Sequence, residues 1–199
     1  MMDRTFTNQA RRAQIVQAAI GAIAELGYPG ASFAQITKRA GLRSPRMISY
    51  HFADKDDLIR QVAIEVFTAG AKYIHEHTSA ADTDLGRLQA HLDANLRFLR
   101  DHPQEVAALT EIGRHLRTVT DERFTSTSAQ EISVQSLEGL LAQGQASGEF
   151  REFDVRAVAI MIRSAVDAAG QRLVEEPEFD FESYTRELIA VFTRVVREN

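Results

Sequence analysis

Cationic, hydroxyl and aromatic side chains gather in one short stretch, residues 37–55. Proteins use such groups on nucleic acids: an Arg fork pairs with guanine acceptors, and Lys, Ser, Thr and Tyr bond to phosphate oxygens. The candidate contacts are Thr37, Lys38, Arg43, Ser44, Pro45, Arg46, Met47, Ser49, Tyr50, His51 and Lys55. Arg46 is the best candidate base reader, whereas a solvated surface is the alternative for Arg43 and Arg46. This stretch predicts a nucleic-acid interface.

A second set of polar residues lies beside apolar positions later in the chain, in pairs one helical turn apart. The set is His91, Asn95, Glu111, His115, Arg163 and Asp167. A few polar groups in an apolar setting are typical of small-molecule sites. The alternative for each charged pair is a surface salt bridge, and Arg163 with Asp167 has a subunit interface as a further alternative. We interpret the set as ligand-binding residues for a small, lipophilic effector.

Signatures of catalysis are missing from the sequence. There is no Gly-rich phosphate loop and no recognisable nucleophile–base set. The chain has no cysteine, which excludes disulfides, thiolate zinc sites and a thiol nucleophile. His75 and His77 are two residues apart, so on a helix they point to different sides and do not share a metal. We expect no enzymatic activity, no catalytic residue, no cofactor and no metal.

Local signals position the first set on a helix-turn-helix. Ser32 with Gln35 three residues later forms a capping-box pattern that begins a helix. Gly41 follows the apolar face of that helix, where a left-handed residue ends it. Ser44 and Pro45 restart a helix at once, with Ser as N-cap and Pro in the first turn. Two helices joined this way place the second in the DNA major groove.

Helical periodicity accounts for the rest of the chain, and no strand pattern is present. Residues 1–8 are expected to be a mobile arm. Besides the helix-turn-helix, helices are expected at about 9–26, 55–77, 84–101, 103–117, 120–147, 155–174 and 181–197. The last two are strongly apolar: they either complete an intramolecular core or pack against a second copy as an intersubunit four-helix bundle.

Composition and charge agree with a helical protein that binds a polyanion locally. The chain is 44% hydrophobic and 26% charged, enough for a core and a solvated surface. No apolar run approaches the roughly 18 residues of a membrane span, and no signal sequence is recognisable, so we expect a cytoplasmic protein without membrane contact. The net charge is −5, yet residues 1–53 hold seven Lys and Arg against two acidic residues. A basic segment on an acidic body favours DNA at that segment.

The stretch from Ile15 to Leu58 resembles the TetR family of bacterial transcriptional regulators. Its first helix ends in Leu26-Gly27, and Ala-Ser-Phe, Ile-Thr-Lys-Arg-Ala-Gly-Leu and Tyr-His-Phe-x-x-Lys-x-x-Leu follow in order. The last motif, Tyr50 to Leu58, is the most specific. The motifs cover about a third of the chain, and the remainder is similar in its order of helices.

One departure from the family pattern lies in the turn. Phe52 is eleven residues after Gly41, one more than the family usually has. The position of the usual phosphate-contacting tyrosine therefore falls on Ser49, with Tyr50 beside it. Which side chain meets which base does not follow from the motif.

The resemblance implies an all-α fold, with an N-terminal three-helix helix-turn-helix DNA-binding domain, residues 1–54, and a larger helical domain, residues 55–199, for ligand binding and dimerisation, about nine helices in all. It implies a homodimer through the last two helices that binds a palindromic double-stranded DNA operator and is released by a small-molecule effector. Repression rests on the family alone. The alternatives are a helical enzyme or a protein-interaction module carrying a helix-turn-helix head.

Overall fold

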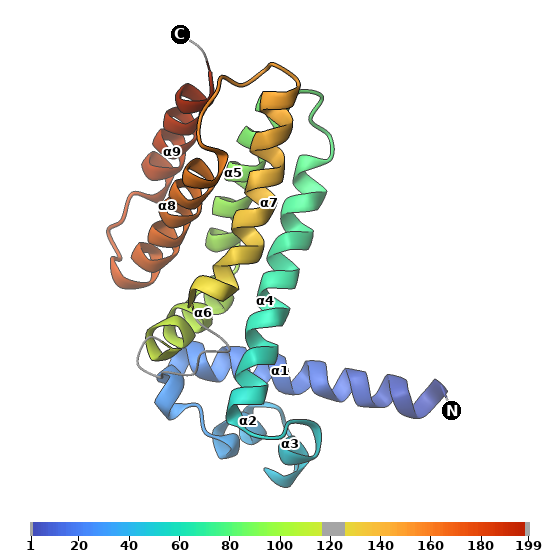
Figure 1. The fold of residues 1–199 in the computed structure, drawn as a ribbon. Helices are drawn as coiled ribbons and strands as arrows, with labels where there is room; N and C mark the ends of the chain where they lie inside the picture. The colour runs from blue at the N-terminus through green and yellow to red at the C-terminus, as the bar shows by residue number, and fades with distance from the viewer. Residues whose placement is uncertain (1, 117–125, 198–199) are drawn as a thin grey trace. The chain divides into compact units, whose positions relative to one another are not determined.

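The computed structural model describes residues 2–116 and 126–197, with side chains described for 8–115 and 131–197. The described residues form helices and no strands (Figure 1). The helices are α1 (Met2–Gly30), α2 (Phe33–Arg39), α3 (Arg46–His51), α4 (Lys55–Thr78), α5 (Asp84–Asp101), α6 (Pro103–Leu116), α7 (Ser126–Ala146), α8 (Val155–Glu175) and α9 (Phe181–Val196). The predicted all-α class is confirmed, while the predicted helix start at Thr120–Asp121 lies outside the described residues.

The chain folds into two compact units. The first contains the residues up to Ala69 together with Gln104–His115, and the second contains Gly70–Pro103 and the residues from Leu116 onward. The division expected from the sequence, 1–54 and 55–199, concerns DNA binding and ligand binding rather than compactness, so it stays a prediction.

Helix α1 differs from its expected range at both ends. It begins at Met2, so residues 2–8 are helical where the sequence predicts an arm; nothing there breaks a helix, since this stretch contains neither Gly nor Pro. At the other end, Gly27 has a left-handed φ of 70°, and one further turn continues to Gly30. The regular helix therefore stops at Leu26, as the leucine–glycine pair predicts.

The first unit is held together by an apolar core between α1, α2, α3 and the beginning of α4. Residues three or four apart on α1 face this core, as helical spacing requires. Its fully buried large side chains are Ile15, Ile20, Ile23, Ile36, Ile48, Phe52 and Leu58. The short helices α2 and α3 are too short to be stable alone, so burial of Ile36 and Ile48 holds them in place.

The second unit has its own core, which α5, α7, α8 and α9 build together. Leucines of α5 form its centre, and α9 closes it: Tyr184 donates a hydrogen bond to the backbone oxygen of Ala165 on α8 at 2.7 Å. At the end of α7, Gly148 has a φ of 77°, the left-handed conformation that glycine favours. Phe150 then folds back onto Gly144, where a Cβ would lie 2.1 Å from the ring. This turn brings the chain to α8.

Helices α8 and α9 keep apolar side chains on their outer surface. Each begins at an aspartate cap, Asp154 or Asp180, whose carboxylate accepts a hydrogen bond from the backbone three residues on. The exposed large apolar residues of the pair are Ile160, Met161, Val174 and Val191. None of the helices in the described part of the chain is long and apolar enough to cross a membrane.

A candidate nucleic-acid interface

The turn between α2 and α3 has the geometry that the sequence predicts. The Ser32 hydroxyl accepts a hydrogen bond from the Gln35 amide at 3.3 Å, one half of the predicted capping box. Gly41 has a φ of 62°, and the Leu42 amide donates to the Thr37 carbonyl at 3.0 Å. The Gly41 amide donates to the Lys38 carbonyl at 3.2 Å. These two bonds satisfy the last carbonyls of α2 and redirect the chain into the turn.

Helix α3 begins one residue later than predicted. Pro45 already has helical angles, φ −57° and ψ −26°, but no side-chain hydrogen bond caps this end. The Ser44 hydroxyl is therefore not the predicted cap; its backbone carbonyl instead accepts from the Met47 amide at 3.1 Å. Proline suits this position because its missing N–H has no partner in a first turn.

Helix α3 has one buried face and one exposed face. Ile48 is fully buried, and Phe52, just after the helix, is 1% exposed and anchors it to the core. Arg46, Ser49 and Tyr50, three and four residues apart, share the opposite face, and Tyr50 is 82% exposed. A helix that presents this face to a groove offers one guanidinium, one hydroxyl and one phenol.

The predicted DNA contacts divide by exposure. Exposed are Lys38, Arg43, Pro45, Arg46, Ser49 and Tyr50; half-buried are Ser44, Met47, His51 and Lys55. Thr37 is 6% exposed, and its hydroxyl donates to the Phe33 carbonyl at 2.6 Å. The structure therefore removes Thr37 from the candidate phosphate contacts, because its hydroxyl already has a partner inside the helix.

Two of the half-buried candidates have intramolecular roles. The Lys55 ammonium donates to the Tyr28 carbonyl at 2.7 Å and lies 4.1 Å from the centre of the Tyr28 ring. Burial lowers the pKa of Lys55. Burial, and then the charges of Arg12 and Arg11, lower the pKa of His51, which favours a neutral imidazole. The Lys55 side chain thus ties the start of α4 to the end of α1 within the first unit.

Arg12 is a positioning residue that the sequence reasoning missed. Its guanidinium donates to the His51 carbonyl at the end of α3 and lies 4.3 Å from the centre of the Phe52 ring. Gln14 adds a second tie, donating to the Ala40 carbonyl at 2.7 Å. Its spacing in the sequence indicates this position: Arg12 precedes the buried Ile15 by three residues, so it lies at the edge of the helix face that packs in the core.

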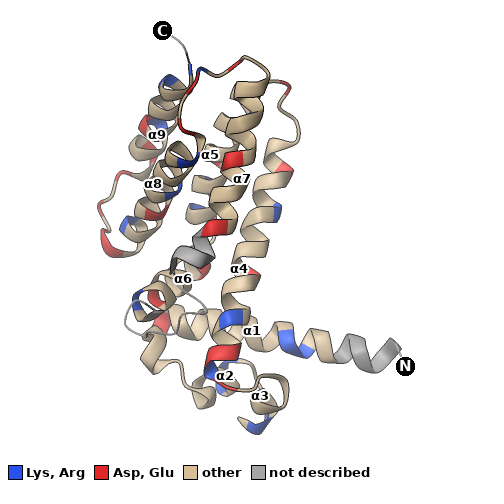
Figure 2. Ribbon diagram, viewed as in Figure 1, with Lys and Arg blue, Asp and Glu red and all other residues tan. Residues whose placement is uncertain are grey.

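The cations around α3 differ in whether an acid neutralises them. Arg39 forms two hydrogen bonds with the Glu25 carboxylate, at 2.5 and 2.7 Å, and this pairing lowers the pKa of Glu25. Lys38, Arg43 and Arg46 form no ion pair with any described residue. Figure 2 shows the basic residues of α1, α2 and α3. Exposed cations without an ion-pair partner, next to a helix that fits the DNA major groove, are suited to bind the phosphate backbone.

The predicted ligand residues are divided between the two compact units. Glu111 and His115 belong to the first unit, whereas His91, Asn95, Arg163 and Asp167 belong to the second. Glu111 accepts a hydrogen bond from Arg114 at 2.7 Å. The His115 ring stacks on Tyr28 with centroids 3.7 Å apart. The assignment of these six residues to a ligand site stays a prediction.

In the second unit, His91 and Arg163 lie in an apolar environment. Burial, and then the charge of Arg163, lower the pKa of His91 to about 4, so the imidazole is neutral near pH 7. Arg163 is 17% exposed and forms an ion pair with Asp167. Its Nε–H is buried without an acceptor among the described residues, an arrangement that costs about 1–3 kcal/mol.

Taken together, the left-handed turn, the buried anchors of α3 and its exposed polar face define a helix-turn-helix DNA-binding protein. Residues 15–62 match the family model described as bacterial regulatory proteins of the tetR family. A transcriptional regulator named BetI from Burkholderia mallei is 32% identical over 98 residues, which cover 47% of this chain and 48% of that protein. Residues 15–62 are thus similar to the DNA-binding region of TetR-family transcriptional regulators, and the chain spans about half the length of the curated relatives it matches.

Solved structures share the whole fold. A TetR-family regulator from Rhodococcus sp. superposes with a TM-score of 0.79 at 24% identity, covering 94% of this chain and 98% of that one. FadR from Bacillus subtilis, solved in complex with stearoyl-CoA, superposes with a TM-score of 0.76 at 19% identity, covering 93% and 99%. At this identity the likeness concerns the fold, and it extends over both units.

Proposed function

We propose that this protein is a ligand-responsive repressor that binds a palindromic DNA operator as a homodimer and is released by a small, lipophilic effector. The observation that carries the proposal is helix α3, whose buried Ile48 fixes it in a helix-turn-helix while Arg46, Ser49 and Tyr50 are exposed. Residues 1–54 are the proposed DNA-binding domain, and residues 55–199 the proposed ligand-binding and dimerisation domain.

The outer surface of α8 and α9 supports dimerisation. Ile160, Met161 and Val191 are 44%, 60% and 45% exposed. Apolar side chains gathered on two adjacent helices are typical of a subunit interface. A second copy that packs its own α8 and α9 there completes a four-helix bundle with two-fold symmetry, and this symmetry matches a palindromic operator.

Two features support a small effector that acts on DNA binding. The core of the second unit is apolar, which suits a lipophilic molecule, and the FadR structure contains stearoyl-CoA. Helix α4 is continuous through both units, since the division falls between Ala69 and Gly70. A shift of its second half on effector binding therefore moves its first half, which packs in the core with α3.

A gel shift on the DNA flanking the protein's own gene tests this proposal. We expect a complex that weakens steeply with salt. Arg46→Ala is expected to cost about 1–3 kcal/mol on the preferred operator and to relax one base position. Arg39→Ala is the matched control, because Arg39 is already paired with Glu25, and it is expected to lose less.

Two outcomes contradict the proposal. If the folded, dimeric protein gives no gel shift at low salt, the proposal that it binds DNA is contradicted. An equal loss on all DNA sequences in Arg46→Ala reassigns this guanidinium from a base to a phosphate.

A further inference from the structure

The second unit contains a buried cation whose hydrogen bonding is incomplete. Arg163 lies on α8, and one of its terminal nitrogens is paired with Asp167 one turn further on. Its Nε–H is buried and has no acceptor in the part of the chain that the structure describes. Native proteins retain few such donors, and those they retain call for a partner. A bound molecule with an oxygen acceptor supplies one.

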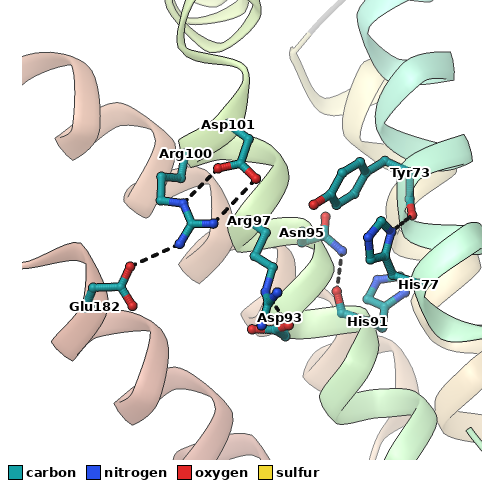
Figure 3. A network of polar contacts seen from close by, with 9 residues as sticks. All are labelled: Tyr73, His77, His91, Asp93, Asn95, Arg97, Arg100, Asp101 and Glu182. Atoms are coloured by element: carbon teal, nitrogen blue, oxygen red, sulfur yellow. Dashed lines mark hydrogen bonds and ion pairs between the residues drawn. The ribbon is translucent and has the colours of Figure 1, made fainter.

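Apolar side chains lie beside this donor. On α8, Ile162 and Val166 are buried beside Arg163, and on α5 the fully buried Leu92 follows His91. The imidazole of His91 is neutral near pH 7, because its burial and the nearby Arg163 guanidinium lower its pKa. Figure 3 shows His91 and Asn95 on α5, with the Asn95 amide donating to the His91 carbonyl at 2.9 Å.

Asp93 of α5 and Asp167 of α8 each pair with a cation of the same helix. Asp93 pairs with Arg97 at 2.7 Å. Asp167, the counterion of Arg163, is more exposed than its partner, 29% against 17%. His77 of α4 stacks on Tyr73, and its Nδ1 bonds to the Tyr73 carbonyl (Figure 3). These ion pairs leave the Arg163 Nε–H without an acceptor among the described residues.

We propose that Arg163, with His91 beside it, receives the acidic head group of an otherwise apolar effector. A carboxylate is the acceptor that matches a guanidinium best, because the planar fork donates two parallel hydrogen bonds to it. The aliphatic side chains around the pair receive the apolar body. The inference rests on the proposed effector-binding role of the second unit and narrows the effector to a lipophilic carboxylic acid.

Calorimetry on the purified full chain without DNA tests this assignment. The probes are the straight-chain carboxylates from hexanoate to hexadecanoate below their micellar concentrations, each compared with the primary alcohol of equal length. We expect the best acid to bind at least about tenfold more tightly than its alcohol, the equivalent of one charge-assisted hydrogen bond. Equal affinities for acid and alcohol, or no binding of any acid by the folded protein, overturn the proposal.

Variants on α8 assign the effect to Arg163. Arg163→Met is expected to lose about tenfold in affinity for the acid and none for the alcohol. Arg172→Met is the matched control, since Arg172 is half-exposed on the same helix and paired with Glu176 at 2.6 Å. An unchanged acid affinity in Arg163→Met contradicts the proposal.

A second variant covers the case in which Arg163→Met does not fold. Asp167→Asn removes the carboxylate that competes for the guanidinium, so it is expected to bind the acid more tightly, whereas a purely structural ion pair predicts no gain. The measurement contains no DNA and is therefore independent of the gel shift. If the protein binds the acid but gives no gel shift, the proposed DNA-binding function is contradicted. If it gives a gel shift but binds no acid, only the proposed acid site is contradicted.

Discussion

At the scale of single residues, Tyr28 has the most unusual environment in the first unit. Its ring lies between the Lys55 ammonium and the stacked imidazole of His115. Its hydroxyl donates to the Asp56 carboxylate at 3.2 Å. Burial, followed by the charge of Asp56, raises the pKa of Tyr28 to about 12. One side chain thus joins the end of α1, the start of α4 and the end of α6.

The raised pKa of Tyr28 predicts a loss of stability at high pH. Its contribution is fully present below pH 10, the ordinary pKa of tyrosine, because the phenol then keeps its proton in both states. As pH rises from 10 toward 12, the unfolded phenol ionises first and the folded state loses this contribution. We expect the stability difference between the native protein and Tyr28→Phe to shift against the native protein over this window. Urea unfolding at several pH values measures it, and a constant difference contradicts the assignment.

At the scale of elements, the end of α7 depends on the absence of one side chain. A Cβ on Gly144 would lie 2.1 to 2.7 Å from the Phe150 ring. Phe150 is 5% exposed, so its ring has little room to move. The close approach lets the chain turn back and reach α8.

Gly144→Ala is therefore expected to destabilise the protein by about 1–3 kcal/mol through overpacking, in spite of the better helix propensity of alanine. Gly139→Ala on the same helix is the matched control, because nothing lies within 4 Å of its Cβ position. This control is expected to gain about 0.5–1 kcal/mol. Free energies of unfolding in urea compare the two, and equal effects would refute the packing explanation.

At the scale of the whole molecule, dimerisation links the two DNA-binding heads. Met161→Glu places a charge on the exposed apolar surface of α8, where burial against a second copy becomes unfavourable. We expect this variant to sediment as a monomer at micromolar concentration and to lose the gel shift, while its helicity is unchanged. Ile64→Glu is the control, since Ile64 is 52% exposed on α4.

A native protein that sediments as a monomer at micromolar concentration contradicts the proposed interface. A dimer that persists in Met161→Glu assigns the interface to another surface. Because an operator contact by one head alone is weak, the gel shift and the sedimentation are expected to change together.

Local signals in the sequence determined the elements of this protein. Ser32 and Gly41 mark the ends of α2 by a cap and a left-handed turn, and both features need only neighbouring residues. The ranges of α4, α5, α8 and α9 followed from periodicity and agree with the structure within one residue. Arg46, Ser49 and Tyr50 of α3, three of the candidate contacts named from the sequence, are exposed.

Only the tertiary structure decided which faces are covered and by what. Thr37 and Lys55 have residue types that suit phosphate, yet the first is buried and the second is bonded to Tyr28. Arg12 acts on α3 from a distance of many residues in sequence. His115 and Arg163 looked equivalent as members of helical pairs, but they belong to different units. The physical reason is that helical spacing specifies a direction around one axis, whereas burial, pKa and bonding depend on the helix that packs against it.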